Sequence, residues 1–406
     1  MKCGLLGRTL AHSYSPQIHS YLGKYTYELF EKEPEDIGAF LQNGDFTAIN
    51  VTIPYKKDVI LYCDELTDCA KKMGAVNTIV RRPDGKLIGH NTDYFGLHYT
   101  FHRMGIALSG KKVLVLGSGG ASVTTIIVLR ELGANVIIIS RSGENNYTNL
   151  HLHQDASMIV NTTPVGMFPN AGLSPVDLDL FPHLEGVLDI IYNPARTKLL
   201  LDAEERNIPC QNGLWMLVAQ AKEAAEWFTD QKISDDMIPK IYKKMCNRME
   251  NIVLIGMPGC GKSTIGKLLA EKLDLPFLDA DTEIVRKTGI SIPEIFEKYG
   301  EDGFRNIETQ VLSELGQASA QVIATGGGCV TRQENYPLLH QNGTIYWIER
   351  DLNSLSTDGR PLSQAGKLEK MYSVRKPMYE AFADVTISNN GCVEETVASI
   401  LKGRQI

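Results

Sequence analysis

A glycine-rich loop at residues 256–264 constrains the fold of this chain more than any other stretch. Its sequence, GMPGCGKST, satisfies the pattern G-x-x-x-x-G-K-[ST], with an apolar run before it (252–255) and an amphipathic run after it (265–273). Backbone N–H groups of such a loop surround phosphate oxygens at a helix N-terminus, while Lys262 neutralises the β and γ oxygens and the Ser263 hydroxyl ligates magnesium. The sequence therefore predicts a nucleotide-binding α/β unit that begins near Met249.

A second glycine-rich turn follows the apolar run of VLVLGSGGAS, residues 113–122. Glycines at 117, 119 and 120 precede a helix expected from about Gly120 to Leu132, whose N-terminus can face a pyrophosphate. Such a turn alone is weak evidence, but the next expected strand, NVIIIS, ends in Ser140, Arg141 and Ser142. NAD sites favour an acid there, whereas hydroxyls and a cation suit a 2′-phosphate. NADP is therefore the expected cofactor.

Composition and length limit the classes of protein that this chain can belong to. Its 406 residues exceed what one hydrophobic core organises, so at least two domains are expected. A net charge of -7 without a run of lysine or arginine argues against nucleic acid as a partner. No stretch reaches the roughly 20 apolar residues that span a bilayer, so we expect a cytoplasmic protein that contacts no membrane.

The eight cysteines are scattered and form no C-x-x-C pair, which argues against disulfides and zinc sites. Cys260 and Cys329 lie within glycine-rich loops. Because Cys260 precedes a predicted helix and stands beside Lys262, we expect its thiol to ionise readily and its alkylation to block the nucleotide site.

The order of apolar and helical patterns predicts three α/β units. Residues 1 to about 110 alternate strand-like runs with helix-like stretches that begin near Pro16, Pro34 and Asp93, which is typical of a mostly parallel sheet. A separate open α/β unit follows, and helices are expected over 212–230 and 235–244. Rising polarity at 247–250 marks the boundary before the last unit. We expect a first domain over 1–247 and a second domain over 250–406. Within the first domain, 1–105 and 230–247 should form one subdomain and 106–229 the other.

Charged residues after the phosphate loop indicate a second anionic ligand. Asp279 and Asp281, in LPFLDADTEI, alternate at a strand end and should both face the loop. Arg305, Arg360 and Arg375 are spread over the last hundred residues, and guanidinium groups match carboxylates bidentately. Each arginine alone is as often a surface ion-pair partner, so the set carries the interpretation.

The segments GMPGCGKST, DADTEI, FRNIE, TGGG, GRPL and VRKPMY resemble shikimate kinase over residues 250 to 402. The resemblance implies that Asp279 helps hold magnesium, that Asp281 orients the attacking hydroxyl, and that Arg305, Arg375 and Gly327 bind the substrate carboxylate. It implies that Arg360, on a lid, meets the transferring phosphoryl group. The nucleotide contacts so implied are Gly259, Cys260, Gly261, Lys262, Ser263, Thr264 and Arg360. The lid is shorter than in the family and lacks the arginine that usually covers adenine.

The first part carries AHSYSP, AINVTIPYKKD, GAVNTIV, GHNTDYFG, GSGGAS, NTTPVGM, LDIIYNP and NGLWMLVAQA, which together resemble shikimate dehydrogenase over residues 1 to 245. Ser13 and Ser15 alone would be taken as helix-capping hydroxyls. The resemblance implies substrate contacts from Ser13, Ser15, Thr52, Asn77, Asp93, Tyr192 and Gln220. It implies cofactor contacts from Gly117, Ser118, Gly119, Gly120, Ala121, Ser140, Arg141, Ser142 and Gly213.

Lys56 matches the catalytic lysine of that family, and the resemblance implies that it exchanges the proton of the reacting oxygen while Asp93 holds it in place. Lys57, its neighbour, is expected to be a solvated surface charge. Only about twenty residues separate Arg141 from Asn161, fewer than the family uses, and this Asn-rich run is a poor helix former. We therefore expect one βα unit of the nucleotide-binding sheet to be trimmed or missing.

The two resemblances together predict an α/β substrate domain, a Rossmann-like NADP domain and a P-loop kinase domain with a parallel sheet, similar to nucleoside monophosphate kinases. They imply reduction of 3-dehydroshikimate to shikimate with NADPH, then phosphorylation of shikimate with ATP and Mg²⁺, in the pathway to chorismate and the aromatic amino acids. Two alternatives stay open at this point. One half could have lost catalysis and serve as a ligand sensor or scaffold, or the substrate could be quinate or another small hydroxy acid.

Overall fold

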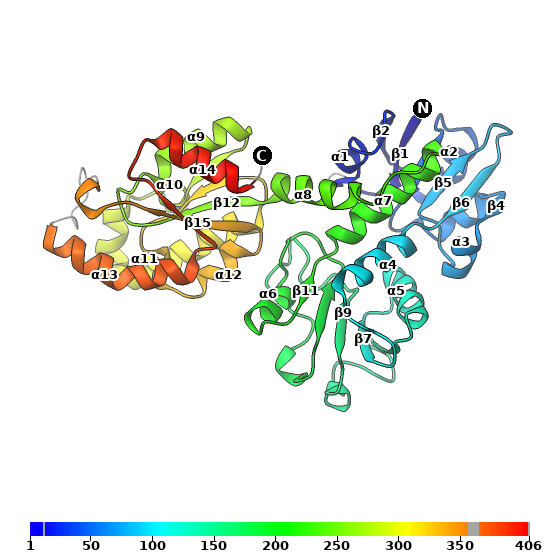
Figure 1. The fold of residues 1–406 in the computed structure, drawn as a ribbon, viewed down its shortest axis with the longest axis horizontal. Coiled ribbons are helices and arrows are strands. Elements are labelled where there is room, and N and C mark those ends of the chain that lie inside the picture. Colours follow the sequence, from blue (N-terminus) through cyan, green and yellow to red (C-terminus); the bar gives the residue numbers. More distant parts are fainter. Residues whose placement is uncertain (11–12, 356–364, 405–406) are drawn as a thin grey trace. The chain divides into compact units, whose positions relative to one another are not determined.

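The computed structural model describes residues 1–10, 13–355 and 365–404. The chain forms two compact units (Figure 1). One comprises residues 1–166, 173–192 and 202–245, and the other comprises residues 167–172, 193–201 and 246–406. The first unit contains two sheets and the second contains one.

The first sheet has the strand order β2-β1-β3-β5-β6-β4. β1 pairs in parallel with β2 and β3, whereas β5 pairs antiparallel with β3 and β6. The turn between β5 and β6 contains Gly85 at a φ of +89°, a left-handed conformation that glycine adopts without strain. The strands are β1 (Lys2–Gly7), β2 (Thr26–Glu31), β3 (Ala48–Val51), β4 (Glu65–Leu66), β5 (Thr78–Arg81) and β6 (Leu87–His90). The helices are α1 (Ser15–His19), η1 (Pro34–Asp36), α2 (Ile37–Asn43), η2 (Asp58–Tyr62) and α3 (Asp68–Met73).

The second sheet is parallel throughout, in the order β11-β10-β9-β7-β8. Its strands are β7 (Lys112–Leu116), β8 (Asn135–Ile139), β9 (Met158–Asn161), β10 (Gly186–Asp189) and β11 (Cys210–Gln211). The helices over this part of the chain are α4 (Asp93–Met104), α5 (Gly120–Glu131), η3 (Leu150–His153), η4 (Leu178–Leu180), α6 (Lys198–Glu205), α7 (Leu214–Thr229) and α8 (Met237–Met249). We expected residues 106–229 to form one part of the first domain. Helix α7, at the end of that range, packs against α1, α4, β3 and β5, which belong to residues 1–105.

The fully described segment between β8 and β9 forms no helix-and-strand unit, in agreement with the expectation of a trimmed or missing βα unit. Between β8 and β9, where every residue is described, the chain forms only the short η3 turn, and β8 is the edge strand of the sheet. Asparagine side chains hold the connecting loop. The Asn149 Oδ1 accepts from the Asn146 N–H at 2.8 Å, and His153 Nε2 lies 2.9 Å from Asn145 Oδ1. Local side-chain bonds of this kind favour turns over helices.

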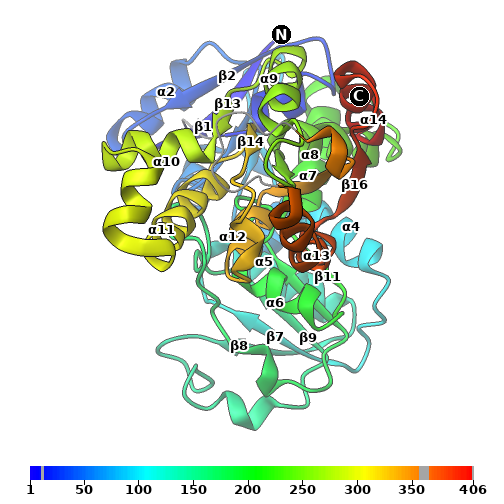
Figure 2. The ribbon, with the colours of Figure 1, turned by 90° about the vertical axis from the view of Figure 1, so that its left-hand side faces the viewer.

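The third sheet, in the second unit, is also parallel, in the order β13-β14-β12-β15-β16. Its central strand, β12, is buried at all five residues, as expected for a parallel strand covered on both faces. Helices α9 and α14 lie together on one face, and α12 and α13 pack on β15 (Figures 1 and 2). The strands are β12 (Asn251–Ile255), β13 (Phe277–Asp279), β14 (Val322–Ala324), β15 (Gly343–Glu349) and β16 (Val385–Ser388). The helices are α9 (Lys262–Leu273), α10 (Ala280–Thr288), α11 (Ile292–Gln317), η5 (Cys329–Thr331), α12 (Asn335–His340), η6 (Leu352–Ser354), α13 (Ala365–Phe382) and α14 (Val393–Arg404).

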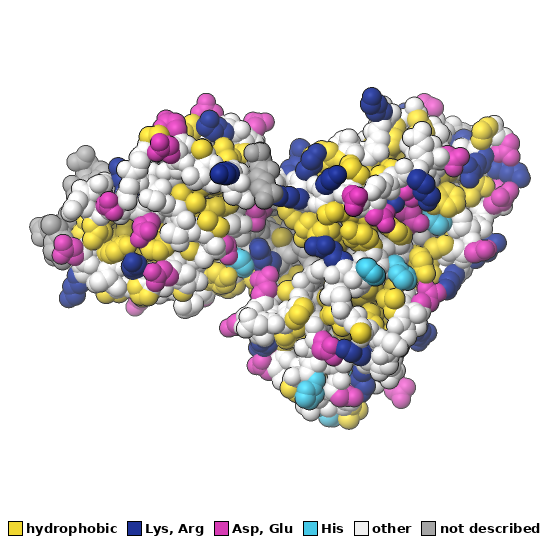
Figure 3. All heavy atoms as spheres, viewed as in Figure 1, with side chains coloured by type: hydrophobic (Ala, Val, Ile, Leu, Met, Phe, Trp, Pro, Cys, Tyr) yellow, Lys and Arg dark blue, Asp and Glu magenta, His cyan; other side chains and the backbone are white. Residues whose placement is uncertain are grey.

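Side chains at helix starts explain where α10 and α11 begin. Asp279 accepts from the backbone N–H groups of Asp281 and Thr282, and Ser291 forms a capping box with Glu294. None of the helices that the structure describes is both long and apolar enough to span a bilayer. On the face in Figure 3, basic and acidic side chains are interspersed over both parts of the chain.

Candidate active sites

Lys56 and Asp93 meet although 37 positions separate them in the chain. Lys56 lies in the turn between β3 and η2, and Asp93 is the first residue of α4, which a two-residue turn separates from β6. The Lys56 Nζ donates to the Asp93 Oδ2 at 2.6 Å, and the two side chains are 30% and 14% exposed. The Lys56 carbonyl also accepts from the Val76 N–H at 2.7 Å, which ties this turn to the start of β5. A partly exposed ammonium held by a carboxylate can exchange a proton with a bound ligand.

Two predicted substrate residues, Asn77 and Gln220, converge on Thr92, the residue before Asp93. The Asn77 Nδ2 donates to the Thr92 Oγ1 at 3.0 Å, and the Thr92 hydroxyl donates to the Gln220 Oε1 at 3.2 Å. These three residues come from the start of β5, from the turn after β6 and from α7. Our sequence reasoning did not select Thr92, although it lies within the motif GHNTDYFG.

The remaining predicted substrate residues of the first part lie near α1 and at strand ends. The Ser13 Oγ accepts from the Ser15 N–H at 3.2 Å. Between them, the Tyr14 ring meets the Tyr192 ring edge-on, with centroids 6.1 Å apart. Burial, and to a lesser extent Tyr14, raises the pKa of Tyr192, so its phenol stays protonated at neutral pH. Thr52 directly follows β3, and its N–H donates to the Leu6 carbonyl at 2.9 Å.

The glycine turn before α5 is open at its helix end. Gly117 has a φ of +107°, and a Cβ there would lie 2.9 Å from the Thr162 Oγ1. Gly119 caps α5 without a side-chain hydrogen bond, and a Cβ on Gly119 or Gly120 would meet nothing within 4 Å. The start of this twelve-residue helix thus has space beside its glycines and no side-chain cap, which fits a phosphate group. Ser118 and Ala121 flank these glycines in the same turn.

The predicted 2′-phosphate contacts follow β8 at the sheet edge. The Ser140 N–H donates to the Asn145 carbonyl at 3.1 Å, whereas Arg141 and Ser142 are exposed. Burial raises the pKa of Tyr147 and the nearby Arg141 opposes that rise, which places the two side chains in one electrostatic environment. Gly213, at the start of α7, is packed on backbone, since a Cβ there would lie 1.9 Å from the Ile190 carbonyl oxygen.

The phosphate loop connects β12 to α9 as the motif requires. Gly256, Gly259 and Gly261 all have positive φ values, of +144°, +82° and +101°. The Lys262 Nζ donates to the carbonyls of Gly256 and Met257 at 2.9 and 3.1 Å. Thr264, the last residue of the motif, lies exposed in the first turn of α9.

A residue far from any recognised motif supports this loop. The Asn389 Nδ2 donates to the Cys260 carbonyl at 2.7 Å, and the Asn389 Oδ1 accepts from the Thr396 hydroxyl at 2.8 Å. Our sequence reasoning missed Asn389, because asparagines in a turn after a strand, here Asn389 and Asn390, are common and indicate no particular contact.

The triple glycine after β14 is the point where the charged residues of the second part converge. A Cβ on Gly326 would lie 2.9 Å from the Asp281 Oδ1 and 2.7 Å from the Glu308 Oε1. A Cβ on Gly328 would lie 2.1 Å from the Arg305 Nη2. On Gly327, a Cβ would lie 2.7 Å from Pro258 of the phosphate loop. Each glycine thus leaves room for a different group. The carboxylates, the Arg305 guanidinium and the phosphate loop therefore all lie close to the triple glycine.

The arginines at this point are oriented by neighbouring acceptors. The Arg305 Nη1 donates to the buried Glu308 Oε2 at 2.6 Å, and the Arg375 Nη1 donates to the Gly327 carbonyl at 3.1 Å. Burial raises the pKa of the Glu308 carboxyl, and the Arg305 guanidinium works in the opposite direction. Arg360, the predicted lid residue, lies outside the described residues.

The predicted magnesium ligands are adjacent. The Ser263 hydroxyl donates to the Asp279 Oδ2 at 2.8 Å, and both belong to elements that meet at the phosphate loop. A hydroxyl with a carboxylate is an all-oxygen donor set, which suits Mg²⁺ when nucleotide phosphates complete its coordination.

The burial of Cys260 argues against the expectation of a reactive thiol, since reaction requires access and Cys260 has an exposed fraction of 0%. Its side chain points into the protein beneath the loop, where a Cβ on Gly256 would lie 3.0 Å from its Sγ. Cys329 is also buried, and burial raises its pKa to about 12, so its thiol stays protonated.

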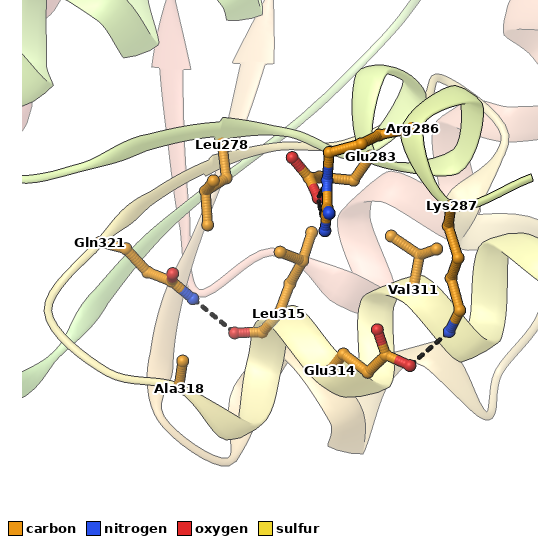
Figure 4. Close-up of a pocket in the computed structure, with 9 residues that line it drawn as sticks. All are labelled: Leu278, Glu283, Arg286, Lys287, Val311, Glu314, Leu315, Ala318 and Gln321. Carbon is orange, nitrogen blue, oxygen red and sulfur yellow. Dashed lines mark hydrogen bonds and ion pairs between the residues drawn. The ribbon is translucent and has the colours of Figure 1, made fainter. Parts of the chain in front are cut away.

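A cavity of about 320 Å³ in the second part lies away from these residues, between β13, α10 and α11 (Figure 4). Its charged side chains pair with one another. Arg286 bonds to Glu283 with 2.7 Å between the Nη2 and Oε2 atoms, and Lys287 bonds to Glu314. None of the predicted site residues lines it, and its charges already have partners.

Comparisons with known proteins give two matches in chain order. Residues 5–79 match the family model of the shikimate dehydrogenase substrate binding domain, and residues 258–403 match that of shikimate kinase. The shikimate dehydrogenase (NADP(+)) of Clostridium beijerinckii is 36% identical over 259 residues, which are 59% of this chain and 96% of that protein.

Solved structures agree with the first of these matches. Shikimate dehydrogenase 1 from Peptoclostridium difficile is 36% identical with a TM-score of 0.55, over 60% of this chain and 97% of that one. A chorismate mutase/shikimate 5-dehydrogenase fusion protein from Clostridium acetobutylicum is 32% identical with a TM-score of 0.57, over 60% and 96%. The chain therefore belongs to the shikimate dehydrogenase family and carries a shikimate kinase domain after the dehydrogenase part.

Proposed function

We propose that this chain is a bifunctional enzyme that reduces 3-dehydroshikimate to shikimate with NADPH and then phosphorylates shikimate with ATP. The relatives that cover the first part are NADP-dependent shikimate dehydrogenases, and the second part matches shikimate kinase. The single observation that carries the proposal is the 2.6 Å bond between Lys56 and Asp93, because it assembles a proton-exchanging pair in the part that the dehydrogenases match.

In the reduction, NADPH supplies a hydride to the carbonyl carbon of the substrate. The carbonyl oxygen then takes a proton from the Lys56 ammonium, which leaves an alcohol and a neutral lysine that regains its proton from solvent. Asp93 keeps the ammonium beside the reacting oxygen and stabilises its charge. We propose that Ser13, Ser15, Thr52, Asn77, Tyr192 and Gln220 hold the other oxygens of the substrate.

The cofactor residues of the first part fit a dinucleotide with a 2′-phosphate. The uncapped N-terminus of α5 can offer N–H groups to the pyrophosphate. The neighbouring strand, β8, is followed by Ser140 and by the exposed Arg141 and Ser142, where NAD sites usually carry an acid. We propose these residues as the NADP contacts.

In the phosphorylation, the attacking group is a hydroxyl of shikimate and the bond that breaks is the one between the γ-phosphorus and the bridging oxygen of ATP. We propose that Asp281 orients this hydroxyl and accepts its proton, while Arg305 and Arg375 hold the substrate carboxylate against the triple glycine. Lys262 neutralises the transferring phosphoryl group. Bound Mg²⁺, held by Ser263 and Asp279, would shield the phosphate charges.

We further propose that the dehydrogenase comprises residues 1–247 and the kinase residues 250–406, and that shikimate passes between them by free diffusion. A cytoplasmic location is proposed because the structure, which describes all eight cysteines, joins none of them in a disulfide, as is usual in reducing compartments. Loss of catalysis in one half is the less supported alternative, because Lys56 meets Asp93 in the first part and Ser263 meets Asp279 in the second.

A coupled assay with 3-dehydroshikimate, NADPH and ATP tests the whole proposal. We expect NADPH consumption followed by phosphorylated shikimate, measured by absorbance and mass spectrometry. Lys56→Ala should abolish NADPH consumption while phosphorylation of added shikimate continues, and Lys262→Ala should do the reverse. Lys57→Ala and Lys267→Ala, which change exposed neighbours, are the matched controls. Failure of the wild-type chain in either half-reaction would refute that half of the proposal.

A further inference from the structure

A chain of hydrogen-bonded side chains crosses the first sheet from β2 to α7. It joins two of the proposed substrate residues to four residues to which we have assigned no function so far. Apart from the partly buried Tyr27, every member is at most 9% exposed. In order, the members are Tyr27, Asn50, Thr78, Asn77, Thr92 and Gln220.

Three backbone groups determine how the amides of this chain are turned. The Thr92 N–H, which can only donate, bonds to the Asn77 Oδ1 at 2.7 Å. The Asn77 carbonyl, which can only accept, receives the Asn50 Nδ2 at 3.3 Å. The Leu217 carbonyl receives the Gln220 Nε2 at 2.9 Å. Each amide therefore has one orientation that satisfies its backbone partner.

The direction of every remaining bond in the first half of the chain follows from these orientations. Because the Asn50 Nδ2 also meets the Thr78 Oγ1 at 3.2 Å, the Asn50 Oδ1 is left to accept from the Tyr27 hydroxyl at 2.8 Å. The Thr78 hydroxyl, which receives from Asn50, uses its one proton on the Asn77 Oδ1 at 3.0 Å.

The second half of the chain runs from Asn77 to Gln220 through one hydroxyl. The Thr92 Oγ1 accepts from the Asn77 Nδ2 at 3.0 Å and lies 3.2 Å from two acceptors, the Gln220 Oε1 and the Asn77 Oδ1. The Asn77 Oδ1 already receives the Thr92 N–H and the Thr78 hydroxyl, which fill both lone pairs of a carbonyl oxygen, so the single Thr92 proton goes to the Gln220 Oε1.

We propose that this chain sets the polarity of the dehydrogenase substrate pocket. With its oxygen filled, Asn77 has only one N–H left to offer, so it binds an acceptor oxygen of the substrate and cannot bind a donor. Tyr27, Asn50 and Thr78 are positioning residues that act through Asn77. The inference rests on the proposed function, because Asn77 is a substrate residue only if the first part binds shikimate.

Thr78 offers the sharpest test, because its hydroxyl bonds directly to the Asn77 Oδ1 and its side chain is fully buried. Thr78→Val keeps the shape and removes the hydroxyl, whereas Thr78→Ser keeps the hydroxyl. The assay is shikimate oxidation by the full chain with NADP. We expect Thr78→Val to raise the KM for shikimate about 5- to 10-fold, in line with one lost hydrogen bond, with the KM for NADP unchanged. Thr78→Ser should return the KM for shikimate to within about twofold of wild type.

Tyr27→Phe tests the far end of the chain, and Tyr25→Phe is its control. Tyr25 is a nearby tyrosine whose hydroxyl bonds to the His19 Nδ1 at 2.7 Å and does not belong to the chain. Tyr27→Phe should raise the KM for shikimate about 2- to 5-fold, and Tyr25→Phe should leave it unchanged. Thermal unfolding of each variant is measured in parallel.

The outcomes separate this inference from the function on which it rests. An unchanged KM for shikimate in Thr78→Val, or equal rises in both KM values without rescue by Thr78→Ser, would overturn the inference while the wild-type enzyme remains active. A wild-type chain that neither binds nor oxidises shikimate would remove the proposed function and the inference together.

Discussion

His19 makes the stability of the dehydrogenase part depend on pH. Its ring is 1% exposed and lies stacked on Tyr27, with centroids 4.1 Å apart, and on Phe228, 5.5 Å apart. Burial lowers the pKa of His19 from 6.5 to about 3, although hydrogen bonding to Asn50 works the other way. The folded protein therefore keeps this ring neutral under all ordinary conditions.

The unfolded chain binds a proton at this histidine below about pH 6.5, whereas the folded protein does not until about pH 3. Stability is therefore unaffected above pH 6.5 and falls as the pH drops through this window. Between pH 7.5 and 5.0 the loss is about 2 kcal/mol, because 1.5 pH units below the unfolded pKa cost about 1.4 kcal/mol each. The loss at pH 5.0 does not depend on the folded value, which lies far below.

Urea unfolding at the two pH values measures this loss. In a Trp347→Phe background the remaining two of the three tryptophans, Trp215 and Trp227, both lie on α7, so fluorescence reports the dehydrogenase part. His19→Asn removes the titrating ring and is the comparison, since other groups titrate equally in both proteins. We expect the original protein to lose about 2 kcal/mol more than His19→Asn between pH 7.5 and 5.0. Equal losses would refute the neutral, buried state of His19.

Three further predictions concern the kinase part. Gly328→Ala places a Cβ 2.1 Å from the Arg305 Nη2, so the KM for shikimate of the kinase should rise about tenfold with dehydrogenase kinetics unchanged; an unaltered KM would contradict the role of Arg305. Gly316→Ala places a Cβ 1.8 Å from the Leu338 carbonyl oxygen and should lower the free energy of unfolding of the kinase part by about 1–3 kcal/mol, measured in urea. Gly403→Ala, whose Cβ would meet nothing within 4 Å, is the control and should change this free energy little. Equal effects of the two variants would contradict the close packing of Gly316 on Leu338. Iodoacetamide should label the exposed Cys392 and spare the buried Cys260 in the native protein, as read by peptide mass spectrometry, and rapid labelling of both would show that the loop opens.

Features set by neighbouring residues could be predicted from the sequence. The phosphate loop, the glycine turn at 117–120 and the start of a new strand after Met249 each depend on the spacing of a few consecutive residues, and the structure has them there. The trimmed or missing βα unit was also predictable, because the segment of about twenty residues is short and its asparagines are poor helix formers. The roles carried over to single site residues, such as Arg141 or Tyr192, stay predictions.

Contacts between distant residues required the tertiary structure. No spacing in the sequence pairs Lys56 with Asp93, a pairing that only the family resemblance implied. Nothing singles out Tyr27, Asn50, Thr92 or Asn389, because each is an ordinary residue until folding supplies its partner. The solvent exposure of a side chain also depended on the tertiary structure. Cys260 lies in a pattern typical of reactive thiols, yet its side chain is buried. Local spacing thus determined which elements and loops form, whereas the side-chain partners and the buried groups depended on how the sheets and helices pack, which a linear pattern does not encode.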